Sequence, residues 1–138
     1  MVSNNLMSRF AENTPWVLFV DDNPQILEAL RGLAEAWPDL RVETAPNAEE
    51  ALRFLVQSPP GLLVSDYSMG PMNGAELILA FRQAWPDLRC VLFTGTQVED
   101  PGPSVKLLQK PLSEADLCFL EDALRAVAEG RPEALRSC

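Results

Sequence analysis

The stretch WVLFVDDNP, residues 16–24, carries the pattern that decides the fold. Its first five residues are apolar, and such a short, bounded run is typical of a buried strand. Two aspartates, Asp21 and Asp22, follow directly. Asn23 and Pro24 then supply a helix N-cap and a first helical residue. The stretch therefore predicts a strand, an acidic turn and a helix in immediate succession.

Three more apolar runs end in the same way. The runs are Gly61–Ser65, Cys90–Phe93 and Lys106–Gln109. The polar residues that follow them are Asp66, Thr94 and Lys110, the last joined to Pro111. If the strands are parallel, their C-terminal ends meet at one edge of the sheet, where open α/β sheets bind ligands. The sequence thus predicts one pocket that holds three carboxylates, a hydroxyl and an ammonium group.

Helical periodicity separates these runs, which predicts an α/β fold with a doubly wound parallel sheet. A second strand is expected at Leu40–Thr44. Four helices are expected, each with apolar residues at helical spacing. The first spans Pro24–Trp37, and the second runs from the Asn47 cap to about Ser58. The third follows the loop 67–74, and the last runs from Ser113 to Gly130. Their inward positions include Leu55 and Val56 in the second helix and Leu117 in the last.

The hexapeptide Ala-Trp-Pro-Asp-Leu-Arg occurs twice, at residues 36–41 and 84–89. Each copy lies between an expected helix and an expected strand. A residue before proline avoids helical geometry, and Pro-Asp favours a turn. We interpret the two copies as the same turn used twice, in preference to an ancient duplication.

The amino-acid composition argues against several classes of function. The chain has 138 residues, 47% of them hydrophobic and 22% charged, which fits one globular domain with a substantial core. The net charge of −9, without a basic run, argues against nucleic-acid binding by this chain alone. No apolar run approaches a membrane span and no signal peptide precedes the first strand, so a cytoplasmic protein is expected. Histidine is absent, which excludes Ser-His and Cys-His catalysis.

The polar sites and their order resemble the receiver domain of bacterial two-component response regulators, the CheY-like superfamily. The resemblance runs from Trp16 to about Gly130. It implies a flavodoxin-like fold with five parallel strands in the order 2-1-3-4-5. The expected organisation is a lead-in at 1–14, a receiver domain at 15–130 and a tail at 131–138.

The resemblance also implies a role for each site. Asp66 would accept a phosphoryl group, and Thr94 and Lys110 would contact it, with a cis peptide bond before Pro111. The implied magnesium ligands are Asp21, Asp22, Asp66 and the backbone carbonyl of Ser68. The chemistry is consistent, because clustered carboxylates favour a divalent cation and carboxylates can form acyl phosphates.

The resulting expectation is a phosphoacceptor domain whose donor is a histidine kinase or a phosphotransfer protein. Such a domain phosphorylates and dephosphorylates itself and is not a turnover enzyme. The segment Leu107–Leu112 is also similar to receivers at the C-terminal ends of hybrid histidine kinases. A stand-alone receiver and a part of a hybrid kinase both remain open.

Two departures from the family pattern concern the switch region. Residues 95–105 are short for the usual fourth helix and contain Pro101 and Pro103. Proline costs about 3 kcal/mol inside a helix, so this helix should be shortened or replaced by a loop. Leu107 stands where receivers usually carry a Tyr or Phe. A receiver-like binding module that works without phosphorylation is therefore the alternative.

Two other classes fit less well. Haloacid-dehalogenase-type phosphatases carry Asp-x-Asp at the nucleophile, whereas Ser68 occupies the second position here. A flavodoxin-type cofactor binder needs a phosphate-binding loop after the first strand. Asp21 and Asp22 at that point would repel a phosphate.

Overall fold

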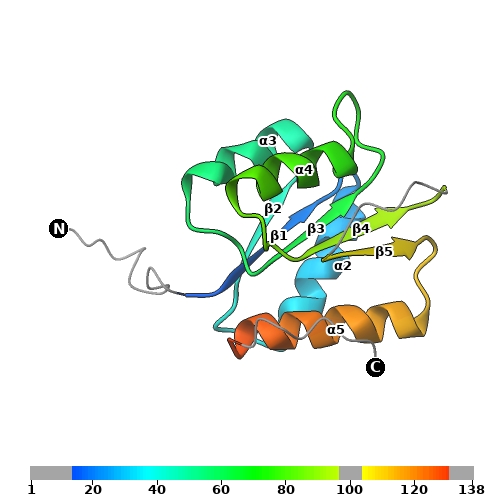
Figure 1. Ribbon diagram of the computed structural model, residues 1–138. Helices are drawn as coiled ribbons and strands as arrows, with labels where there is room; N and C mark the ends of the chain where they lie inside the picture. The colour runs from blue at the N-terminus through cyan, green and yellow to red at the C-terminus, as the bar shows by residue number, and fades with distance from the viewer. Residues whose placement is uncertain (1–13, 97–103, 131–138) are drawn as a thin grey trace.

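The computed structural model describes residues 14–96 and 104–130 and contains one parallel five-stranded sheet (Figure 1). The strands are β1 (Trp16–Val20), β2 (Arg41–Ala45), β3 (Leu62–Asp66), β4 (Cys90–Thr94) and β5 (Val105–Gln109). Their order in the sheet is β2-β1-β3-β4-β5. The predicted strand order is confirmed.

Helices cover both faces of the sheet. They are α2 (Pro24–Ala34), α3 (Ala48–Leu52), the 3-10 helix η1 (Arg53–Val56), α4 (Gly74–Ala84) and α5 (Glu114–Ala128). In Figure 1, α3 and α4 lie on one side of the sheet, and α2 and α5 lie on the other. The doubly wound architecture follows from this alternation.

Side-chain caps fix where the helices begin. Asn23 accepts a hydrogen bond from the Gln25 amide at the start of α2. Ser113 and Asp116 form a reciprocal capping box at the start of α5, the helix that the sequence predicts from Ser113. An equivalent box between Asn73 and Glu76 opens α4. Each cap satisfies backbone N–H groups that have no partner within the helix.

The central strands are buried on both faces, which explains their continuous apolar sequence. On β1, Trp16 and Leu18 belong to the core beneath α3 and α4. Val17 and Phe19 belong to the core beneath α2 and α5. The same alternation continues along β3 and β4, so the polar residues at the ends of these strands are held on a rigid, packed base.

Some details of the sequence prediction are wrong. Helix α2 ends at Ala34 and does not reach Trp37. The second helix tightens into η1 after Leu52, and Val56 is 90% exposed because a 3-10 helix has a shorter period than the predicted α-helix. Leu117 lies in the first turn of α5 and is 41% exposed, while the neighbouring Phe119 is buried.

The two copies of the hexapeptide form the same turn. The Leu40 amide donates to the Trp37 carbonyl at 2.9 Å, and the Leu88 amide donates to the Trp85 carbonyl at 3.0 Å. Trp37 packs against the core beneath α2 and α5, whereas Trp85 packs against the core beneath α3 and α4. The predicted turn is therefore present in both copies, although the two turns serve opposite faces of the sheet.

The fourth helix that the sequence predicts to be shortened or lost would lie in the connection between β4 and β5. Gly95, Thr96 and Ser104 are described and are not helical. The residues 97–103 lie outside the described part of the chain. The expected lead-in up to residue 13 and the tail 131–138 also lie outside it.

Gly61 sets how closely the end of α5 approaches the sheet. A Cβ atom at Gly61 would lie 2.5 Å from Cγ1 of Val127. We expect Gly61→Ala to lower the free energy of unfolding by about 1–3 kcal/mol, because Val127 is branched and has little rotamer freedom. Urea unfolding followed by tryptophan fluorescence measures the change.

Gly32→Ala is the matched control for this substitution. Gly32 lies within α2, and nothing lies within 4 Å of the added Cβ. Alanine should therefore stabilise the domain there by about 0.5–1 kcal/mol. Equal stability of Gly61→Ala and the unaltered chain would contradict the packing argument.

Candidate functional site

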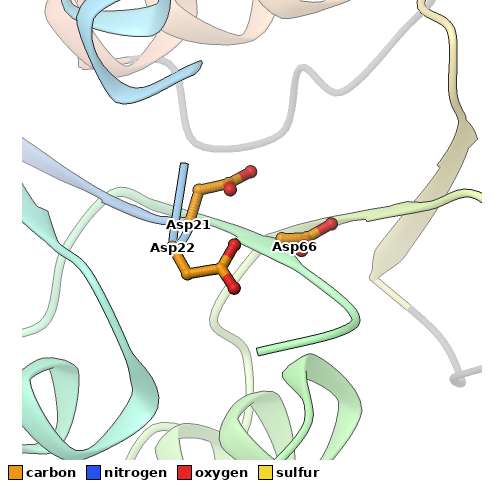
Figure 2. Close-up of side chains that lie close together, drawn as sticks. All are labelled: Asp21, Asp22 and Asp66. Atoms are coloured by element: carbon orange, nitrogen blue, oxygen red, sulfur yellow. The ribbon is translucent and has the colours of Figure 1, made fainter. Parts of the chain in front are cut away.

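Three carboxylates gather where β1 and β3 end (Figure 2). Asp21 and Asp22 directly follow β1, and Asp66 is the last residue of β3. Each side chain offers one oxygen, and these oxygens lie within 4.8 Å of one another. Asp21 and Asp66 are buried and Asp22 is exposed. The predicted convergence of the acidic residues at the sheet edge is therefore present.

Asp21 is a buried carboxylate with only one of its two oxygens hydrogen-bonded within the described part of the chain. Its Oδ1 atom accepts a hydrogen bond from the Asn23 amide at 2.9 Å, but its buried Oδ2 atom has no hydrogen-bond partner among the described residues. Burial raises the pKa of Asp21 above its ordinary value of 3.8, and the charge of Asp66 raises it further against the lowering effect of the Asn23 amide. A buried oxygen of this kind favours a proton or a cation nearby.

Lys110 provides one positive charge at the cluster. Its Nζ atom lies 2.9 Å from Oδ1 of Asp66 and 3.9 Å from Oδ2 of Asp21. Burial by itself lowers the pKa of Lys110, but the hydrogen bond and charge of Asp66, with those of the other carboxylates, raise it above 10.5. The ammonium group is therefore charged at neutral pH. The peptide bond between Lys110 and Pro111 is cis, as the family resemblance implied.

Thr94 lies at the C-terminal end of β4, next to the strand that leads to Lys110. Its hydroxyl donates to the Thr96 carbonyl at 2.7 Å and accepts from the Thr96 amide at 3.0 Å. The Thr94 carbonyl accepts from the Lys110 amide at 2.8 Å. The hydroxyl is thus committed to a local turn, and contact with a group bound at Asp66 would require it to leave the Thr96 carbonyl.

The donor set fits a magnesium ion. Three carboxylates carry more negative charge than the single ammonium group of Lys110 can neutralise, and the Oδ2 atom of Asp21 has an unused acceptor site. Magnesium prefers a few carboxylate oxygens together with water or phosphate oxygens. Ser68, the fourth predicted ligand, lies two residues after Asp66 in the loop before α4 and is exposed.

Two residues beside Asp66 were not selected from the sequence. Ser65 is fully buried, and its hydroxyl donates to the Asp66 carbonyl at 2.9 Å. Gly74, the first residue of α4, approaches the same carbonyl so closely that a Cβ atom would lie 2.2 Å from its oxygen. The sequence does offer one sign of Ser65, because it is a lone serine in an apolar strand. A buried hydroxyl needs a hydrogen-bond partner, so such a serine indicates a specific contact.

Comparison with known protein families identifies the family to which this chain belongs. The family model described as "Response regulator receiver domain" matches residues 17–118. This chain belongs to that family. Receiver domains of two-component response regulators are signalling domains, and the acidic cluster, Lys110 and Thr94 lie within the matched residues.

Solved receiver domains share the fold. The signal receiver domain of an HD domain-containing protein from Pseudomonas fluorescens Pf-5 has 26% sequence identity, with a TM-score of 0.71. That alignment covers 88% of this chain and all of the other. A CheY-like receiver domain protein from Methanospirillum hungatei JF-1 has a TM-score of 0.70, covers 88% of this chain and 100% of the other, and is 24% identical.

Curated relatives include proteins of several lengths. The response regulator Rre1 of a Synechocystis species is 33% identical over 67 residues, which are 49% of this receiver chain and 29% of Rre1. The sensor histidine kinase TmoS of Ectopseudomonas mendocina is 28% identical over 108 residues, 78% of this chain but 11% of TmoS. An uncharacterized 14.6 kDa protein of Leptolyngbya boryana is 45% identical over 67 residues, 49% of this chain and 50% of that protein. The chain thus spans half or less of these relatives.

Within the described part of the receiver domain, no helix has the length and apolar character needed to cross a membrane.

Proposed function

We propose that Asp66 accepts a phosphoryl group from the phosphohistidine of a histidine kinase or a phosphotransfer protein. The observation that carries the proposal is the contact of Lys110 Nζ with Asp66 Oδ1, at 2.9 Å, inside a cluster of three carboxylates. Such a cluster favours cations and leaves a carboxylate oxygen next to a fixed ammonium group. Phosphoryl transfer needs little beyond this positioning and charge neutralisation.

The residues have separate roles in this reaction. An Asp66 carboxylate oxygen forms a bond to phosphorus while the bond from phosphorus to the histidine nitrogen breaks, and the imidazole takes up a proton from solvent. Lys110 binds a phosphoryl oxygen, and the Thr94 hydroxyl, once released from Thr96, donates to another. Asp21, Asp22 and Asp66, with the Ser68 carbonyl, would hold magnesium. When bound, that ion neutralises charge on the phosphoryl oxygens.

The proposed setting is a phosphorelay in the cytoplasm, with residues 15–130 as the receiver unit. Water later hydrolyses the acyl phosphate, so the domain returns to its starting state without acting as a turnover enzyme. The alignment with the sensor histidine kinase TmoS covers 78% of this chain, which keeps a parent hybrid kinase within the proposal. The net charge of −9 supports a protein partner over a nucleic acid.

Intact-mass spectrometry with magnesium and acetyl phosphate tests the proposal. We expect one phosphoryl adduct on the unaltered chain and none on Asp66→Asn, because an amide is a far weaker nucleophile than a carboxylate. Chelation of magnesium should also remove the adduct. Glu114→Gln, a substitution of an exposed carboxylate at the start of α5, should leave the adduct unchanged.

The outcome separates this function from its alternative. An adduct that persists in Asp66→Asn would assign the phosphoacceptor elsewhere. No adduct on the unaltered chain, even with beryllofluoride offered as an acyl-phosphate mimic, would favour a binding module that works without phosphorylation. The observations that favour this second function are the Thr94 hydroxyl committed to Thr96 and the half-buried Leu107 at the switch position.

A further inference from the structure

Ser65 is a polar residue within the otherwise apolar first four positions of β3. Its side chain is fully buried, on the sheet face that α4 covers, where Leu63 also points. The hydroxyl donates to the Asp66 carbonyl oxygen at 2.9 Å and lies 3.9 Å from the sulfur of Met69. A hydroxyl in such an apolar setting is tolerated because it has these partners.

The peptide group between Asp66 and Tyr67 is held at both of its polar atoms. Its carbonyl oxygen accepts from Ser65, and its amide, on Tyr67, donates to the Phe93 carbonyl at 2.7 Å. Gly74 encloses the same carbonyl oxygen from the side of α4, where a Cβ atom would lie 2.2 Å away. The orientation of this peptide plane is therefore fixed by neighbours on two strands and a helix.

We propose that Ser65 is a positioning residue for phosphoryl transfer to Asp66. The peptide plane that Ser65 holds and the Asp66 carboxylate share the same Cα atom. If this plane turned, the chain from Asp66 to Ser68 would follow another course, and the end of β3 that bears the carboxylate would have to adjust its position relative to Lys110. Transfer rates depend steeply on such placement, because a misplacement of about 1 Å costs on the order of a hundredfold. This inference rests on the function proposed above.

Cys90 offers a matched control for a purely structural role. It is fully buried on the same face of the sheet, and it begins β4 beside Leu63, away from the acidic cluster. Its sulfur contacts the Leu88 carbonyl at 3.7 Å. Cys90→Ala and Ser65→Ala each remove one buried heavy atom that contacts a backbone carbonyl, so a packing defect alone should affect both variants alike.

The experiment measures the rate of adduct formation against acetyl phosphate concentration at saturating magnesium, corrected for the folded fraction from urea unfolding. We expect Ser65→Ala to lower the maximal rate about tenfold with an unchanged half-saturating concentration. Cys90→Ala should keep the full rate. Ser65→Cys, which has a slightly larger side chain and a weaker donor, should fall between Ser65→Ala and the unaltered chain.

Each possible result either supports or overturns the positioning role of Ser65. Equal maximal rates for Ser65→Ala and Cys90→Ala would overturn it while leaving phosphorylation of Asp66 intact. If Ser65→Ala does not fold, a full rate in Ser65→Cys overturns it and a reduced rate supports it. No adduct on the unaltered chain would overturn the proposed function and this inference together.

Discussion

Gly74→Ala is expected to lower the free energy of unfolding by about 3 kcal/mol and to slow phosphorylation of the remaining folded protein about a hundredfold. The added Cβ atom would lie 2.2 Å from the Asp66 carbonyl oxygen and 2.8 Å from Cδ1 of Leu92. The first of these neighbours is backbone, so it cannot rotate away as a side chain can. Either α4 or the end of β3 must shift.

Urea unfolding and the rate of adduct formation measure the two effects separately. Gly32→Ala again serves as the control, because it adds the same methyl group within a helix where nothing lies within 4 Å. That variant should be at least as stable as the unaltered chain and should be phosphorylated at the same rate. A Gly74→Ala variant with unchanged stability and rate would show that the contact between α4 and Asp66 is not tight.

Asp21→Asn is expected to have opposite effects on stability and on metal binding. Burial and the charge of Asp66 raise the pKa of Asp21, so the ionised carboxylate opposes folding. Asparagine keeps the shape and an oxygen for the Asn23 amide. We expect the metal-free variant to gain about 1–2 kcal/mol in the free energy of unfolding, and its magnesium affinity to fall by about tenfold or more.

The pH dependence of the gain follows from the sign of the pKa shift. A raised pKa means that the folded protein binds a proton at Asp21 more readily than the unfolded chain does. The penalty for the ionised group is therefore complete above the raised folded pKa, shrinks as the pH falls through it, and disappears below the ordinary value of 3.8. The advantage of Asp21→Asn should follow the same course.

Thermal unfolding with and without magnesium provides the measurement. Magnesium should raise the unfolding temperature of the unaltered chain by mass action and should have a much smaller effect on Asp21→Asn. Asp39→Asn, at an exposed turn between α2 and β2, is a control that should change neither stability nor the magnesium response. A metal-free Asp21→Asn variant that is less stable than the unaltered chain would contradict the electrostatic argument.

The sequence was informative where the determinants are local. The acidic pair follows a continuous apolar run and Asp66 follows a mostly apolar one, and parallel pairing brings such strand ends together at one edge. The caps at Asn23 and Ser113 also depend on neighbouring residues only. The caps therefore required no knowledge of which segments meet in the folded chain, and the acidic residues required only that the strands pair in parallel.

Other features depend on contacts between distant segments. The proximity of Gly74 to the Asp66 carbonyl requires the packing of α4 on β3, and no residue spacing reveals it. The commitment of the Thr94 hydroxyl to Thr96 depends on the conformation of a turn. An α-helical period continued past Leu52 predicts a buried Val56, but the backbone changes there to a 3-10 helix.

The repeated Trp-Pro-Asp-Leu turn shows that the local reversal of the chain and the choice of sheet face are determined separately. The copies at Trp37–Leu40 and Trp85–Leu88 close with the same backbone hydrogen bond, yet their tryptophans join different cores. The hexapeptide therefore determines how the chain reverses but carries no instruction about the face on which the preceding helix packs. That choice must come from the long-range crossovers, whose handedness is constrained by the twist of the sheet.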